Sequence, residues 1–276
     1  MDLSWISALA PWLLTWETAL LLVGGFVVGI FSVIIGGGFF VSIPLLQFLF
    51  PSVSYGAIVG NLKVGSFFRG IGSTITNRKE IDWLGNLLWS VPLVIGTVLG
   101  VTVIAHLHQR WMLPAIIAAI ALSELAPWLA KRITKRSFQA ASLATGAYAG
   151  FLGAGMGIIL VALFRLKHPE VEKIAHVKIQ ARFIEWLIVI VAVIAHYFHG
   201  NLILALWLVW SVGSFAGGLA GGVLLEMLGA MSGKIQKSVL RLAYLLAIAG
   251  ALLPFLNWGK GKRAPAIARK IGRAHV

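Results

Sequence analysis

The sequence predicts an all-α polytopic membrane protein with about 8–10 membrane helices, arranged as two homologous repeats of opposite orientation. Of the 276 residues, 59% are hydrophobic and only 12% are charged, whereas a typical soluble domain has about 25% charged residues. The mean hydropathy is +0.92. Apolar runs of roughly 20 residues, long enough to cross a bilayer core, recur along the chain. A glycine-rich break also occurs once in each half, at 36–38 and at 153–157.

The apolar runs and the breaks between them define the expected helices. The Trp-rich start of the chain is expected to lie at the membrane surface, because Trp favours the interface. In chain order, the expected helices are 18–35, 39–50, 54–77, 83–105, 111–130, 138–153, 157–167, 172–198, 201–228 and 236–256. The expected organisation is an N-terminal interfacial segment (1–17), a first membrane repeat (18–130), a basic linker (131–137), a second membrane repeat (138–256) and a basic C-terminal tail (257–276).

Composition and motifs exclude several functional classes. The chain has no cysteine, which excludes disulfides, thiol nucleophiles and Cys-based metal sites. The net charge of +14 does not indicate nucleic acid, because most basic residues occupy short breaks between apolar runs, as loops on the cytoplasmic side of a membrane do. The sequence has no recognisable acid–base pair, nucleophile elbow or metal-ligand spacing. We therefore predict no enzyme activity, no metal and no cofactor.

Two internal alignments support the repeat. A shift of 121 residues places WSVPLVIGTVLG (89–100) on WSVGSFAGGLAG (210–221). A shift of 118 residues superposes Gly37 on Gly155, Pro51 on Pro169, Val53 on Val171, Ala57 on Ala175 and Val59 on Val177. The order of these matches is the same in both halves, which predicts a two-repeat chain.

Basic residues in matching loops indicate that the halves are inverted. The break near Pro51 has no Lys or Arg, whereas its counterpart carries Arg165, Lys167 and Lys173. The next break reverses this bias, with Arg78 and Lys79 in the first half and no Lys or Arg at 196–201 in the second. Two halves of opposite orientation should differ in this way. In a ten-helix topology the basic C-terminal tail faces away from the other basic loops, so the absolute orientation stays open.

The two glycine breaks are the strongest pointer to a functional site. The helix expected at 39–50 spans about 18 Å at 1.5 Å per residue, well short of a roughly 30 Å bilayer core. Short, glycine-interrupted segments in matching positions of two halves indicate a transporter's substrate site. Glycine lets a ligand approach the backbone, and the helix N-terminus after each break favours an anion. The glycines concerned are Gly36, Gly37, Gly38, Gly153, Gly155 and Gly157.

Basic residues inside the expected helices indicate that the ligand of this site is negatively charged. Lys63 and Arg69 lie on 54–77, and Lys178 and Arg182 lie on 172–198. Each costs about 2.5–3.5 kcal/mol at mid-span, so such residues generally face a cavity or a partner. We expect all four to bind the anion, assisted by two neighbouring hydrogen-bond donors, Asn61 and His176.

Purely structural roles stay open for these features. Small residues at a break can simply allow close helix packing, which is what we expect for GSFAGGLAGG at 213–222. Lys63 and Lys178 could extend to the membrane surface, and Arg182 could pair with Glu185. Arg69 has no acidic residue within reach on its own helix, which favours a ligand or a tertiary partner.

Proton coupling has three candidate carriers, Glu124, Glu185 and His176. Glu124 is the one acidic residue of the expected helix 111–130, and it could instead pair with Arg69. We expect two further histidines, His196 and His199, to be interfacial rather than functional.

The motifs resemble those of the TauE/SafE sulfite exporter family (TSUP). In the first half they are Gly36–Gly38, PLL at 44–46 and AIVGNLK at 57–63. In the second half they are GFLGAGMG at 150–157 and AHVK at 175–178. The resemblance covers about residues 20 to 256. Met156 and Ala162 depart from the family pattern, as does the charged stretch KIQARFIEW, and these departures bear on which anion is carried.

The resemblance implies a bacterial inner-membrane, multi-pass permease for small anions such as sulfite or organosulfonates. Combined with the residues above, it leads us to expect a secondary transporter that works by alternating access, with a small anion and the lipid bilayer as its partners. A passive small-anion channel and a non-transport membrane scaffold are the alternatives. Flux that ignores a pH gradient would indicate the channel, and absence of anion binding would indicate the scaffold.

Overall fold

The structure is a computed structural model that describes residues 15–35, 38–50, 53–107, 111–130, 132–134, 136–153, 156–169, 171, 174–228 and 238. These residues form helices joined by short connections, without a strand. The helices are α2 (Trp16–Ile35), α3 (Gly38–Leu49), α4 (Tyr55–Asn77), α5 (Trp83–Ala105), α6 (Met112–Ala130), α7 (Phe138–Phe151), α8 (Met156–Lys167), α9 (Ile174–Phe198) and α10 (Leu204–Leu228). The all-α prediction is confirmed.

Helix ends agree with the predicted ones to within about three residues, and the differences have local causes. α2 begins at Trp16, so it takes in the last two residues of the predicted interfacial segment. α10 begins at Leu204 instead of 201, because the Asn61 side chain binds the backbone of Asn201 and Ile203 and holds this turn out of the helix. The rest of the interfacial segment, the expected helix 236–256 and the basic tail lie outside the described residues, apart from Ser238.

Polar side chains and one glycine set the ends of three helices. The Ser54 hydroxyl accepts a hydrogen bond from the Ala57 amide at the start of α4. Asp82 caps α5 in the same way, through the Gly85 amide. Gly153, with φ of 71°, stops α7 at the second glycine break, and such left-handed residues end many helices because they satisfy the last carbonyls. The start of α4 and the end of α7 are therefore specified locally.

Glycines bring two pairs of helices into backbone contact. A Cβ added at Gly146 of α7 would lie 2.0 Å from the Leu93 carbonyl oxygen of α5, and one at Gly217 of α10 would lie 2.2 Å from the Phe26 carbonyl oxygen of α2. Such approaches are typical of membrane helices, where small residues allow backbones to pack closely. The packing role expected for the glycines of 213–222 is confirmed at all five, Gly213, Gly217, Gly218, Gly221 and Gly222.

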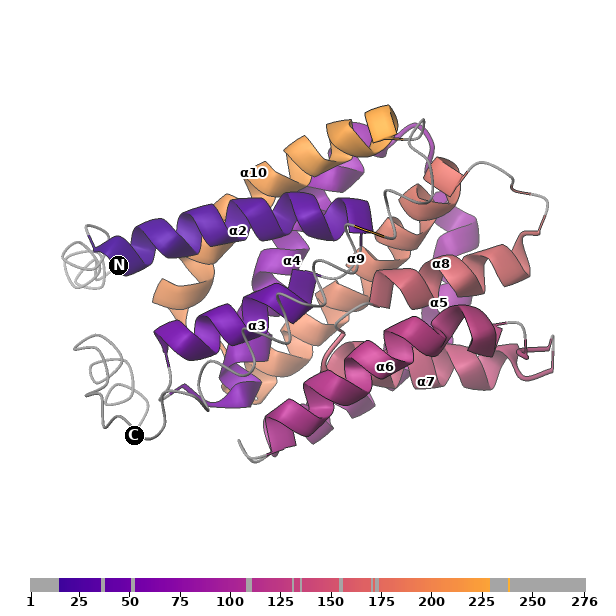
Figure 1. Ribbon diagram of the computed structural model, residues 1–276. Helices are drawn as coiled ribbons and strands as arrows, with labels where there is room; N and C mark the ends of the chain where they lie inside the picture. The colour runs from indigo at the N-terminus through magenta and orange to yellow at the C-terminus, as the bar shows by residue number, and fades with distance from the viewer. Residues whose placement is uncertain are drawn as a thin grey trace.

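Helices of the first half pack against helices of the second half. Figure 1 shows α10 running beside α2, and α6 and α7 on the opposite side of the molecule. α10 of the second half packs on α2 of the first, while α5 of the first half packs on α7 of the second. α4 and α9 are in contact with each other between these pairs. This arrangement is what two interlocked repeats would produce, although the repeat itself stays a prediction.

Three of the described helices are long and apolar enough to cross a membrane: Trp16–Ile34, Trp83–Ala105 and Leu204–Leu225. Their outer faces expose large apolar side chains, among them Val23, Leu88, Leu99 and Val212. Contiguous apolar faces of this kind are unusual on a protein surrounded by water. The chain is therefore an all-α membrane protein, and the number of eight to ten membrane helices stays a prediction.

Gly146→Val tests whether backbone contact between α5 and α7 holds the fold. The added side chain must push the helices apart, and overpacking of this kind costs about 1–3 kcal/mol. We expect a lower thermal unfolding temperature for the detergent-purified protein. Ala144→Val, at an exposed position of the same helix, is the control. Equal unfolding temperatures for the two variants would contradict the packing described here.

Candidate functional site

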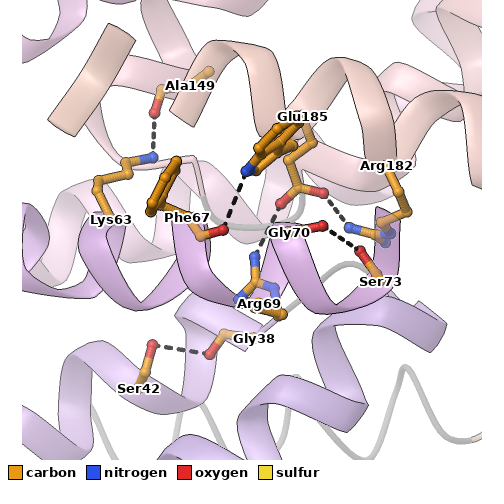
Figure 2. A network of polar contacts seen from close by, with 11 residues as sticks. Gly38, Ser42, Lys63, Phe67, Arg69, Gly70, Ser73, Ala149, Arg182 and Glu185 are labelled. Carbon is orange, nitrogen blue, oxygen red and sulfur yellow. Dashed lines mark hydrogen bonds and ion pairs between the residues drawn. The ribbon is translucent and has the colours of Figure 1, made fainter. Parts of the chain in front are cut away.

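Two arginines share one carboxylate in the buried contact between α4 and α9. Arg69 Nη2 of α4 lies 3.3 Å from Glu185 Oε1, and Arg182 Nη1 of α9 donates to Glu185 Oε2. Figure 2 shows the Glu185 carboxylate between the two guanidinium groups. The three side chains are only 8–10% exposed. The expected pairing of Arg182 with Glu185 is confirmed, and Arg69 has the tertiary partner that its own helix does not provide.

The charges in this group, which we call the Arg–Glu–Arg cluster (Arg69, Glu185 and Arg182), do not balance. Two guanidinium groups face one carboxylate, so the cluster carries one excess positive charge in a buried position. Burying charge is costly unless the charge is paired. Guanidinium groups also bind oxyanions through parallel hydrogen bonds. The cluster is therefore suited to a small anion with several oxygens.

Lys63 lies between the two broken segments. Its side chain is among the largest fully buried ones, at 1% exposed, which excludes the alternative that Lys63 extends to the membrane surface. Nζ donates to the Ala149 carbonyl oxygen of α7 at 2.6 Å and lies 4.6 Å from the centre of the Phe39 ring at the start of α3. A Cβ added at Gly153 would lie 2.5 Å from Nζ. One ammonium group thus touches both glycine-broken regions.

Arg182 is packed against the start of α8. A Cβ added at Gly157, the second residue of that helix, would lie 2.6 Å from Arg182 Nη2. The first amide groups of a helix have no partner within it and form the positive end of its dipole. The Arg182 guanidinium therefore lies against the N-terminus of α8, in space that any side chain larger than that of glycine at position 157 would fill. An anion bound at the second break stays a prediction.

Lys178 binds a helix end of the first half, just as Lys63 binds a helix end of the second half. Its Nζ donates at 3.3 Å to the Ile34 carbonyl oxygen at the end of α2, just before the first break. Lys63 donates to a carbonyl at the end of α7, just before the second break. Each lysine thus neutralises the negative end of a helix from the other half. The half-buried Lys178 is held by this contact rather than extended freely into solvent.

Polar residues continue from the cluster along one face of α4. Ser66, Arg69, Ser73 and Asn77 are all buried and follow one another at three- or four-residue spacing, which places them on one side of the helix. Two cavities of about 10 Å³ each lie along this face, one lined by Ser66 and Arg69 and the other by Ser73 and Asn77. Each is about the size of one water molecule. This polar face was not predicted, although its spacing is visible in the sequence.

Other predicted site residues lie elsewhere or are already engaged. Asn61 donates to the Ala57 and Asn201 carbonyls and accepts from the Ile203 amide, so its amide holds the turn before α10. His176 pairs with Glu80 at 3.4 Å near the end of α4, where both side chains are partly exposed.

The predicted glutamates differ in their surroundings, and only some of the predicted glycines lie in the described part of the chain. Glu124 is exposed on α6, and Arg69 pairs with Glu185 instead. Gly38 begins α3 and packs against Ser32. The remaining predicted glycines, Gly36, Gly37 and Gly155, lie outside the described residues.

One comparison with known proteins gave a match. The family described as "Sulfite exporter TauE/SafE" matches residues 21–253. The chain belongs to the TauE/SafE family. Members of this family are exporter-type membrane transporters rather than enzymes, and membership implies a small anion as substrate. Searches among curated proteins and among solved structures gave no match.

Glu185→Gln tests the role of the carboxylate in the Arg–Glu–Arg cluster. Without the negative charge, two guanidinium groups are left buried and unpaired, and breaking such a pair costs up to about 3–5 kcal/mol. We expect a lower unfolding temperature, partly restored by sulfite because the anion replaces the missing charge. Glu124→Gln, at an exposed position, should unfold like the wild type. An unchanged unfolding temperature for Glu185→Gln would show that the cluster contributes no stability.

Proposed function

We propose that this TauE/SafE protein is a secondary transporter of small sulfur-containing anions such as sulfite or organosulfonates, located as a multi-pass protein in a bacterial inner membrane. The observation that carries the proposal is the excess of buried positive charge where α4, α9 and the second glycine break meet. Arg69 and Arg182 share one carboxylate, and Lys63 has no carboxylate among its described contacts. A bound oxyanion would balance this charge.

The anion would bind between the start of α8 and the two arginines. Its oxygens would accept hydrogen bonds from Arg182, which lies against Gly157, and from amides of the first turn of α8 beyond Met156, whose own amide donates to the Gly153 carbonyl. Arg69 would complete the site from α4. Bidentate guanidinium contacts and helix N-termini both favour an oxyanion over a simple halide.

Glu185 would act as an internal counter-ion that the anion replaces. In the structure its two oxygens bind the two arginines, so a substrate oxyanion competes for the same guanidinium hydrogens. When the anion leaves, the carboxylate returns to both arginines and closes the site. This exchange avoids leaving either guanidinium unpaired at any stage.

Two features support alternating access over a permanently open channel. The cavities beside the Arg–Glu–Arg cluster have volumes of about 10 Å³, too small for sulfite, so the helices must move before the anion can enter. Lys63 and Lys178 each join one half of the molecule to the helix end of the other. An anion that attracts Lys63 would weaken its contact with the Ala149 carbonyl, which links binding to movement between the halves.

A flux panel in proteoliposomes tests the function directly. Purified protein should transport radiolabelled sulfite, with competition from sulfonates and thiosulfate, because these share the oxyanion geometry that the site requires. Transport should saturate, and a pH gradient should drive accumulation. Flux that does not respond to the gradient would indicate the passive channel. No flux, together with no thermal stabilisation by any of these anions, would indicate the membrane scaffold.

Lys63→Met tests the anion site with a neutral side chain of similar length. A hydrogen bond to a charged group contributes about 1.5–3 kcal/mol, which corresponds to about a 10- to 100-fold rise in KM for sulfite. Lys79→Met is the control, since Lys79 is exposed after α4. Sulfite transport that is equal in both variants would remove Lys63 from the site.

Gly157→Ala tests the contact between Arg182 and α8. The new Cβ would displace the guanidinium from the helix start, so the KM for sulfite should rise while the protein still folds. Gly200→Asn is the control, because this glycine has nothing within 4 Å of the added Cβ and a φ of 67°, which Asn tolerates. Unchanged sulfite transport in Gly157→Ala would place the anion elsewhere.

A further inference from the structure

His196 is a fully buried imidazole near the end of α9, where an interfacial position was expected. Its exposed fraction is 0%, so the interfacial prediction is wrong for this residue. The ring lies against α4, where a Cβ added at Gly60 would be 3.1 Å from His196 Nδ1. Gly60 is one turn before Lys63. None of the contacts proposed for the anion involves His196, although its ring is buried beside α4.

The ring forms a hydrogen bond with the turn before α10. Nδ1 lies 3.2 Å from Asn201 Nδ2, and because an amide nitrogen only donates, Nδ1 is the acceptor and the proton of the neutral ring is on Nε2. Nε2 is buried and has no hydrogen-bond partner among the described residues. Buried polar groups without a partner are rare in folded proteins and often have a functional reason.

The surroundings of the ring are positive or neutral. Burial opposes a charge on the ring most strongly, followed by the charges of Lys63 from α4 and of His199 from the turn after its own helix. The turn before α10 contributes Asn201, which is uncharged. A second positive charge on the imidazole is therefore opposed by the Lys63 ammonium. An anion held by Lys63 would cancel that opposition.

We propose that His196 is the proton-binding group of the transporter and takes up one proton when an anion occupies the site beside Lys63. This inference rests on the proposed function and adds the group that couples it to protons. It takes the place of three other candidates: Glu124 is exposed, His176 pairs with Glu80 at a partly exposed position, and Glu185 has to bind the two arginines again when the anion leaves. Binding of the anion and binding of the proton then favour each other equally.

The step balances in charge and in protons. One proton from water binds Nδ1, which turns the neutral ring into an imidazolium with an N–H on each nitrogen. The Asn201 amide then rotates, so that its oxygen accepts from Nδ1–H where its nitrogen had donated. The ring gains one positive charge for one negative charge on the ligand. When the anion leaves, the proton returns to water and the amide rotates back.

The test separates anion exchange from proton-driven accumulation in proteoliposomes. His196→Gln removes the titrating ring but keeps a polar side chain. His199→Gln, at an exposed position three residues further along the chain, is the matched control. Radiolabelled sulfite is followed first at equal pH with sulfite on both sides, then with a pH gradient and sulfite outside only. Comparing His196→Gln with the wild type and with His199→Gln removes the effect of sulfite's own protonation, which is the same in all three.

We expect His196→Gln to keep sulfite exchange and to lose accumulation driven by the pH gradient, while His199→Gln keeps both. Gradient-driven accumulation in His196→Gln equal to that of the wild type would overturn the proposal. So would loss of both activities in a variant that elutes and unfolds like the wild type, because the ring would then be structural. Absence of sulfite exchange in the wild type would instead refute the proposed function.

A second measurement uses the unmodified chain, in case His196→Gln does not fold. The resonance of His196 in carbon-labelled histidine NMR is assigned by replacing the other histidines in turn. Adding sulfite should convert this resonance from neutral imidazole to imidazolium. A ring that stays neutral at saturating sulfite would contradict the proposal.

Discussion

Two arginines held around one carboxylate in the contact between α4 and α9 are the constraint on which the rest of the structure depends. A buried excess of charge is tolerable only if the surroundings are fixed and polar. Ser66 and Ser73 provide part of that polar face. α4 and α9 are enclosed by helices that present the apolar surface which membrane lipid requires. The charged centre and the apolar exterior therefore depend on each other.

The glycines serve two separate purposes in this arrangement. Along α5, α7, α2 and α10 they remove side chains where two backbones meet, which packs the outer helix pairs. At Gly153 and Gly157 they leave space for the Lys63 ammonium and the Arg182 guanidinium. The same residue type therefore allows close packing in the scaffold and close approach of a charge in the site. What differs is the group that fills the space.

Movement of an anion through such a site has to break and remake a small number of contacts. The Lys63 and Lys178 contacts to carbonyls at helix ends, and the Arg69–Glu185 contact, each connect separate helices, whereas Arg182 and Glu185 pair within α9. The proposed anion competes for the two arginines and for Lys63 through its charge. His196, beside Gly60 of α4, extends this electrostatic linkage to a proton. In the proposed mechanism, charge balance joins binding to conformational change.

Much of this could be predicted from the sequence, because hydropathy, breaks and caps depend on neighbouring residues. The helices, the two glycine breaks and the four cations within helices followed from such patterns. Their partners did not, since Arg69 and Glu185 are 116 residues apart, Lys63 and Ala149 are 86 apart, and Lys178 and Ile34 are 144 apart. Asn61 was predicted to bind ligand but holds a turn, and His196 was predicted to be interfacial but is buried. Only the packing of α4 against α9 and its neighbours decides which polar groups meet, because periodicity gives the face of a helix but not what lies against it.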